Sequence, residues 1–176
     1  PIYTDNRKTL AYPEIRSFVK QELVHLVHEH FADATAVAGV ATGAIAQGAL
    51  VADELGLPFC YVRSKAKDHG MGNLIEGTLP EGAKVVVVED LISTGGSSLK
   101  AVEALREAGF KVVGMVASYT YGFQIAEEAF NAADLKLVTI CDYEATTEIA
   151  AESGYISKED IEVLKQWRKS PSTWKQ

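Results

Sequence analysis

Two adjacent acids and a turn of small residues follow a run of four valines in the segment 85-VVVVEDLISTGGSS-98. The glycines let several backbone N–H groups converge on one point, and the helix expected to begin near Ser97 adds a partial positive charge. The hydroxyls of Thr94, Ser97 and Ser98 can donate to the same anion. The carboxylates of Glu89 and Asp90 can accept hydrogen bonds from sugar hydroxyls. The segment therefore predicts a sugar-phosphate site, and a ribose 5-phosphate fits it best.

A simpler interpretation of these residues is a helix cap beside a solvated acid. It leaves the Thr/Gly/Ser turn without a purpose. The nucleotide-binding patterns GxxxxGK[ST] and GxGxxG are absent from the sequence. Two acids would also repel a bare nucleotide triphosphate, which again favours a sugar phosphate.

A second group of residues, 63-RSKAKDH-69, alternates basic and other side chains. In an extended chain one side would carry Arg63, Lys65, Lys67 and His69. Gly70, Gly72 and Gly77 follow and give the segment mobility. An exposed polar hairpin is the alternative, but a basic cluster in a chain of net charge −7 is not background. We expect it to bind a polyanionic part of the substrate.

The elements around these segments alternate between strands and helices. We expect helices over 13–31, 45–56, 97–108 and 124–133, strands over 35–41, 58–63, 84–90, 111–120 and 135–141, and two further helices in the tail. In the tail, 157-SKED-160 resembles a capping box, and Trp167 and Trp174 are expected to pack the last helix. This order predicts an α/β fold, a parallel sheet with helices on both faces and a site at the carboxyl ends of the strands. No linker divides the chain, so we expect one domain over 1–176.

Composition excludes some classes of function. The net charge of −7 disfavours nucleic-acid binding as the main activity, and no apolar run is long enough to cross a membrane. The start of the chain has no signal-peptide pattern and opens on Pro1 in what reads as a strand, so we expect residues to be missing before it. Cys60 and Cys141 match no disulfide or metal spacing, and we expect both in the core of a cytoplasmic protein.

Three segments carry a resemblance to a known family. Residues 85–98 resemble the phosphoribosyl pyrophosphate (PRPP) motif of type I phosphoribosyltransferases. The stretch 61-YVRSKAKDHGMGNLIEG-77 resembles the mobile catalytic loop of the orotate phosphoribosyltransferase family, and PIYTDNR at the start resembles that family's early substrate-contacting strand. The resemblance covers roughly residues 1–145. It implies a type I phosphoribosyltransferase-like fold and Mg²⁺-dependent transfer of ribose 5-phosphate from PRPP to orotate, a step of pyrimidine synthesis.

The resemblance also implies roles for individual residues. Lys67, Asp68 and His69 would be catalytic and, in a homodimer, would act on the neighbouring subunit's site. The substrates would hold Mg²⁺, with no direct protein ligand. The PRPP-binding residues would be Arg63, Lys67, His69, Glu89, Asp90, Leu91, Ile92, Ser93, Thr94, Gly95, Gly96 and Ser97, and the orotate-binding residues Ser93, Tyr3, Arg7 and Tyr121.

The sequence departs from the family pattern at two places. Thr42 and Gly43 stand where some members have a Tyr-Lys pair, and Tyr121 stands where some have an arginine that meets the orotate carboxylate. The candidate partners for that carboxylate are Arg7, backbone amides and residues missing before Pro1. A purine-type phosphoribosyltransferase and a PRPP-sensing regulator remain as alternatives, although the RSKAKDHG stretch favours orotate.

Overall fold

The computed structural model describes residues 4–65, 74–169, 171 and 174. One six-stranded sheet, in the order β3-β2-β1-β4-β5-β6, runs through the described residues. Its strands are β1 (Ala36–Val40), β2 (Phe59–Val62), β3 (Ile75–Glu76), β4 (Lys84–Ile92), β5 (Lys111–Thr120) and β6 (Leu137–Asp142). All pairings are parallel except that of β2 with β3. The predicted α/β fold is confirmed, with a short antiparallel edge strand that the sequence did not reveal.

The helices lie close to their predicted positions. They are the 3₁₀-helix η1 (Asn6–Ala11), α1 (Pro13–His30), α2 (Ile45–Leu55), α3 (Gly96–Glu107), α4 (Gln124–Ala132), α5 (Tyr143–Glu152) and α6 (Lys158–Lys169). The predicted capping box at the start of α6 is confirmed, because Ser157 Oγ donates to Asp160 Oδ2 and also accepts from the Asp160 N–H.

The expected strand at the start of the chain is wrong for its described part. Residues 4–5 have no regular structure, and η1 follows them. The Thr9 hydroxyl donates to the Asn6 carbonyl at 2.6 Å and closes a local turn. Such side-chain bonds offer the backbone an alternative to strand pairing.

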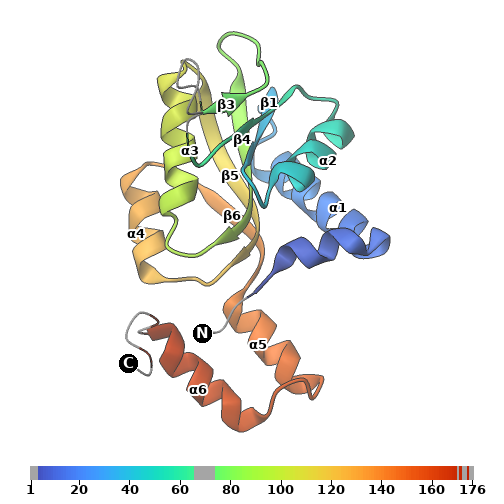
Figure 1. The fold of residues 1–176 in the computed structure, drawn as a ribbon, viewed down its shortest axis with the longest axis vertical. Helices are drawn as coiled ribbons and strands as arrows, with labels where there is room; N and C mark the ends of the chain where they lie inside the picture. The colour runs from blue at the N-terminus through green and yellow to red at the C-terminus, as the bar shows by residue number, and fades with distance from the viewer. Residues whose placement is uncertain (1–3, 66–73, 170, 172–173, 175–176) are drawn as a thin grey trace.

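Helices cover both faces of the sheet, with α3 and α4 on one side and α1 and α2 on the other (Figure 1). The central strand β4 is therefore apolar on both faces, and Val85 to Val88 are fully buried. Odd-numbered valines of β4 pack toward α3, and even-numbered ones pack toward α1 and α2. Cys60 lies in the core as expected, but Cys141 is exposed, because β6 forms an edge of the sheet.

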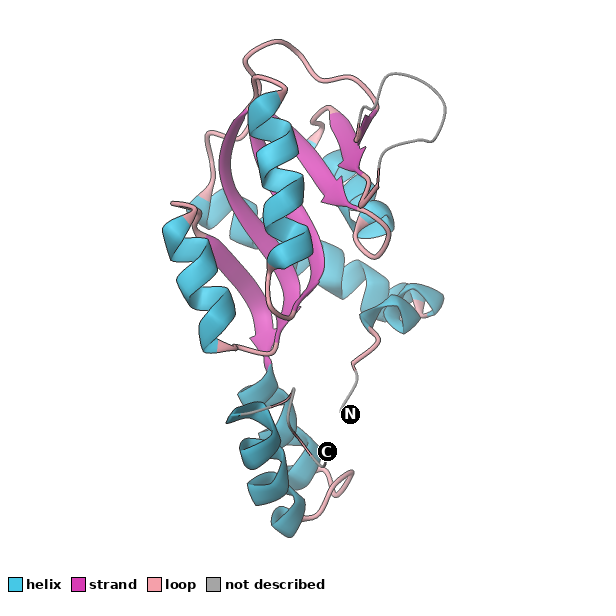
Figure 2. Ribbon diagram, turned by 60° about the vertical axis from the view of Figure 1, so that its left-hand side comes forward, coloured by secondary structure: helices cyan, strands magenta, loops and turns pink. Residues whose placement is uncertain are grey.

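The last two helices form a hairpin beyond the carboxyl end of β6 (Figure 2). It is joined to the sheet by an aromatic cluster of Tyr119, Tyr121, Tyr143 and Trp167, against which Trp174 packs. The predicted packing role of the two tryptophans is confirmed. Among the described residues, no helix combines the length and apolarity that a membrane span requires.

Candidate active site

The connections that follow the parallel strands β1 and β4 leave the sheet toward opposite faces. The connection after β1 leads into α2 on one face of the sheet, and the connection after β4 leads into α3 on the other. The pairing of the two strands ends at Gly39 and Val88, so the last residues of β4 pair only with β5. Such a crevice at the carboxyl ends of parallel strands is where ligands bind in open α/β sheets.

β4 separates the two acids because consecutive strand residues point to opposite faces. Glu89 follows the side of Val85 and Val87 and faces α3. Asp90 lies on the opposite side, where an added Cβ at Gly43 would come within 2.7 Å of its Oδ2. The two adjacent acids therefore lie in different surroundings.

Glu89 lies in the interior, with only 6% of its surface exposed. Its Oε2 accepts from the Ser98 hydroxyl at 2.7 Å, and its Oε1 accepts from the Asp90 N–H at 2.8 Å. Burial raises the pKa of Glu89 to about 7, although both hydrogen bonds act in the opposite direction. Asp90 contributes only the smallest of the causes, so repulsion between the neighbours is minor.

Asp90 is half-buried near the carboxyl end of β4. Burial raises its pKa, while the positive charge of Arg7 and a hydrogen bond from the Asn6 side chain lower it. The Asn6 amide Nδ2 also donates to the Asp90 backbone carbonyl at 3.1 Å. The N-terminal segment is therefore held against the acid, and Arg7 lies close enough to act on it electrostatically.

The turn at residues 93–97 leads directly into α3. Gly95 precedes the helix with φ of 81°, a conformation that favours glycine. Ser93, Thr94, Gly96 and Ser97 are exposed, so their amides and hydroxyls are accessible at the start of the helix. Ser98, however, is 1% exposed and donates to Glu89, so its expected role as a phosphate donor is wrong. Ile92 is fully buried, and its carbonyl accepts from the Tyr121 N–H at 3.0 Å.

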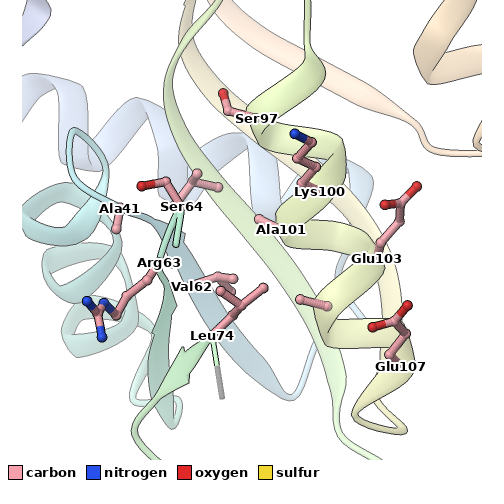
Figure 3. Close-up of a pocket in the computed structure, with 12 residues that line it drawn as sticks. Ala41, Val62, Arg63, Ser64, Leu74, Ser97, Lys100, Ala101, Glu103 and Glu107 are labelled. Atoms are coloured by element: carbon pink, nitrogen blue, oxygen red, sulfur yellow. The ribbon is translucent and has the colours of Figure 1, made fainter. Parts of the chain in front are cut away.

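Arg63 lies between two cavities at the end of β2. One cavity, of about 580 Å³, opens toward the loop after β1 and includes Thr42 and Lys65 in its lining. The other, of about 370 Å³, lies between β2 and α3 and is lined by Ser64, Ser97 and Lys100 among others (Figure 3). Lys67, Asp68 and His69 lie outside the described residues, so their predicted roles stay predictions.

The residues predicted to bind orotate differ in their exposure to solvent. Tyr121 is 6% exposed, stacks on Phe123 and accepts the backbone N–H of Thr4 with its hydroxyl at 3.0 Å. Arg7 is half-exposed and pairs with Asp5 at 2.8 Å. Tyr3 lies outside the described residues. The structure thus brings the N-terminal segment to both Tyr121 and Asp90, and it places Ser93 in the exposed turn.

Comparisons with known proteins agree with this geometry. Residues 14–153 match the family described as "Phosphoribosyl transferase domain". Over 174 residues the chain is 64% identical to the orotate phosphoribosyltransferase of Porphyromonas gingivalis. The aligned segment covers 99% of this chain and 83% of the relative. The chain belongs to the orotate phosphoribosyltransferase family.

Solved structures of the family have the same fold. Orotate phosphoribosyltransferase from Aeropyrum pernix matches with a TM-score of 0.77 at 32% identity, over 88% of this chain and 85% of that one. The Mycobacterium tuberculosis enzyme in complex with PRPP matches with a TM-score of 0.65 at 27% identity, over 80% of each chain.

Two contacts of this family member were not found from its sequence. Asn6 meets the Asp90 backbone from 84 positions away, and no local pattern indicates such a contact. Gly43, seen only as a missing lysine, is packed so closely against Asp90 that a side chain there would displace the acid. A glycine three residues after the end of a buried strand was the available signal.

Proposed function

We propose that this chain transfers ribose 5-phosphate from PRPP to orotate, giving orotidine 5-phosphate and pyrophosphate. The observation that carries the proposal is that Asp90 closely precedes the turn 93–97, with its exposed Ser93, Thr94, Gly96 and Ser97, in the part of β4 that no longer pairs with β1. The names of its relatives, at 52–64% identity, support orotate as the acceptor. The solved complex of a relative with PRPP supports the donor.

The turn 93–97 would bind the 5-phosphate. The first N–H groups of α3 have no partner within the helix, and the helix N-terminus favours an anion. Asp90 would accept a hydrogen bond from a ribose hydroxyl, which is stronger than a neutral one because the acceptor is charged. Ser93 and the N-terminal segment with Tyr3, Arg7 and Tyr121 would form the orotate side.

The basic segment would act on the leaving group. Breaking the bond between C1 and pyrophosphate increases negative charge on pyrophosphate and positive charge on the ribose. Cations held near the departing oxygens stabilise this transition state more than the ground state. Arg63 lines the cavity beside the loop after β1, which supports this role. Lys67, Asp68 and His69 would add to it from the sequence-based assignment.

Mg²⁺ is the cation we propose for this reaction. In the part of the chain that the structure describes, no group of three or more His, Cys, Asp or Glu side chains could hold a metal ion. Mg²⁺ is usually bound by one or two carboxylates together with substrate phosphates, so the diphosphate of PRPP would be its main ligand. The ion would supply charge neutralisation on the diphosphate, while Asp90 orients the sugar.

The proposal also includes a homodimer, a cytoplasmic location and one domain over residues 1–176. The proposed location is supported by two free cysteines, Cys60 and Cys141. Support for the single domain comes from the sheet, to which the aromatic cluster joins the last helices.

The test of the activity is orotate consumption with and without PRPP in the presence of Mg²⁺, followed by absorbance. We expect loss of orotate only with PRPP, and no product from adenine or hypoxanthine. Turnover of a purine base without turnover of orotate would reject the proposed acceptor. A gel shift with nucleic acid at physiological salt would instead support a regulator.

The proposed action of the loop in trans has a separate test. Lys67→Ala and Asp90→Asn would each be inactive, and the two proteins would be mixed with subunit exchange confirmed. If Lys67 serves the neighbouring site, half of the randomly exchanged dimers carry one intact site, so about a quarter of wild-type activity should return. A confirmed mixed dimer without activity would assign Lys67 to its own subunit's site.

A further inference from the structure

The aromatic cluster lies between the α5–α6 hairpin and the carboxyl end of β5. Tyr121 directly follows β5 and contacts the other three rings of the cluster. The centroid of its ring lies 5.9 Å from that of Tyr143 in α5, 5.7 Å from that of Trp167 in α6 and 5.4 Å from that of Tyr119 in β5. All four side chains are buried. Closely packed rings have little room to move, so the hairpin fixes the position of Tyr121.

Two tyrosine hydroxyls at the end of β5 hold a residue from the beginning of the chain. Tyr121 Oη accepts from the Thr4 backbone N–H at 3.0 Å, across 117 positions of sequence. The Tyr119 hydroxyl shares a hydrogen bond with the Thr4 side chain and another with the side chain of Thr146 in α5. Thr4 is therefore held through its backbone and its side chain, by two tyrosines that the hairpin contacts.

Thr4 belongs to the segment proposed to bind orotate. Tyr3 directly precedes it in the sequence and Arg7 follows three positions later, and both are predicted to bind the base. Between them, Asn6 Nδ2 donates to the Asp90 backbone carbonyl at 3.1 Å. The segment is thus attached at two points, to the end of β5 through Thr4 and to the end of β4 through Asn6. Because residues 4–5 have no regular structure, these hydrogen bonds fix their position in place of strand pairing.

Arg168 of α6 adds a second link between the hairpin and the end of β5. Its Nη2 donates to the Gly122 carbonyl at 3.0 Å, and its Nη1 donates to Glu144 Oε2 of α5 at 3.5 Å. Gly122 directly follows Tyr121, and a Cβ added there would lie 2.7 Å from Arg168 Nη2. The guanidinium therefore holds the backbone next to Tyr121, while the aromatic cluster holds its ring.

We propose that the α5–α6 hairpin positions the orotate side of the proposed site, with Tyr119, Tyr121 and Trp167 as positioning residues that act through Thr4. This inference rests on the proposed function. Tyr121 would then serve orotate binding through the N-terminal segment. The proposed 5-phosphate site lies at the start of α3, on a different connection of the sheet, so the two substrates should respond differently when the hairpin is perturbed.

Removal of one hydroxyl tests the hold on Thr4. Tyr121→Phe keeps the ring but removes the acceptor of the Thr4 N–H. From the usual net contribution of one hydrogen bond, we expect KM for orotate to rise by about fivefold. The Kd for ribose 5-phosphate, measured by calorimetry, should change by less than about twofold, because the start of α3 keeps its contacts.

Tyr143→Phe is the matched control. Tyr143 is 3% exposed in the same cluster, and within the described part of the chain its hydroxyl has no hydrogen-bond partner. This variant loses the same atom from the same surroundings without touching Thr4. Both KM for orotate and Kd for ribose 5-phosphate should therefore stay within about 1.5-fold of wild type.

Two further sets of variants test the rest of the path. Trp167→Ala should raise KM for orotate by about tenfold, because small displacements of binding groups lower rates strongly, and Trp167→Phe should restore most of the loss. KM for PRPP should change by less than about threefold in both. In Thr4→Val/Tyr119→Phe the effects on KM for orotate should not add, because the two changes remove one shared hydrogen bond.

Hydrogen exchange in the free protein measures the hold without any substrate. Amides of residues 4–9 should exchange faster in Tyr121→Phe and in Trp167→Ala than in wild type or Tyr143→Phe. Failure of the wild type to consume orotate would reject the proposed function, and the exchange rates would still decide whether the hairpin holds the N-terminal segment.

Four results would overturn the inference. An unchanged KM for orotate in Tyr121→Phe would show that the hold on Thr4 positions nothing. An equal rise in Tyr143→Phe would assign the effect to the cluster as a whole. A rise in KM for PRPP as large as that for orotate in Trp167→Ala would mean general loosening of the fold. A raised KM for orotate in Tyr121→Phe with wild-type exchange at residues 4–9 would show that Tyr121 meets the base itself.

Discussion

Two adjacent glycines at the start of α3 should respond in opposite ways to the same substitution. Gly95 has φ of 81°, and a Cβ added there would lie 2.8 Å from Phe130 Cε2. The left-handed conformation costs a residue with a Cβ about 1–2 kcal/mol, and crowding a packed core costs about 1–3 kcal/mol more. Phe130 is 3% exposed and has no solvent to move into. We expect Gly95→Ala to lower the free energy of unfolding by about 2–5 kcal/mol.

Gly96 is the internal control for this prediction. It is the first residue of α3, its φ is not in the left-handed region, and an added Cβ would meet no atom within 4 Å. Alanine there reduces the entropy of the unfolded chain and suits a helix, so Gly96→Ala should raise the free energy of unfolding by about 0.4–1 kcal/mol.

The assay is equilibrium unfolding in urea without substrate, so that effects on ligand binding do not enter. A third variant, Gly95→Ala/Phe130→Leu, should be less destabilised than the sum of its single changes, because the smaller side chain relieves the contact but not the backbone strain. Equal changes at Gly95 and Gly96 would refute the reasoning from backbone conformation. Strict additivity in the double variant would refute the contact with Phe130.

Other predictions concern the two acids and the glycine beside them. Asp90→Asn should reduce kcat/KM for PRPP by about 1.5–3 kcal/mol of transition-state stabilisation, measured by initial rates, and unchanged kinetics would exclude a ribose contact. Because burial raises the pKa of Glu89 from 4.5 to about 7, protonated Glu89 contributes stability of about 3 kcal/mol that is complete below pH 4.5 and lost as pH rises through 7. In urea titrations the stability difference between wild type and Glu89→Gln should therefore change across this range, and a constant difference would contradict the shift. Gly43→Ala should displace Asp90, because the added Cβ would lie 2.7 Å from Asp90 Oδ2. We expect it to raise KM for PRPP by about tenfold. An unaltered KM would mean that the loop between β1 and α2 moves instead.

The sequence alone was sufficient for the five parallel strands and for the helices α1 to α6, but not for β3 or η1. The alternation of strands and helices follows from local residue types, because apolar residues recur with a helical period in some segments and form short apolar runs in others. Gly56 ends α2 in a left-handed conformation, as a glycine at that position predicts. The apolar run before Glu89 predicted a strand buried on both faces, and β4 lies at the centre of the sheet. The order of strands and helices then predicts a site at the carboxyl edge of the sheet.

Only the tertiary structure decided what surrounds each residue of the candidate site. Both acids carry a carboxylate, but their surroundings differ. Helix α3 covers the face of β4 on which Glu89 lies, whereas Asp90 lies against the N-terminal segment and Gly43. Burial of Ser98 against Glu89 likewise depends on where α3 lies, and not on the Thr/Gly/Ser pattern of the turn. Contacts between residues far apart in the chain depend on how the helices pack, and a local pattern of residue types does not contain that information.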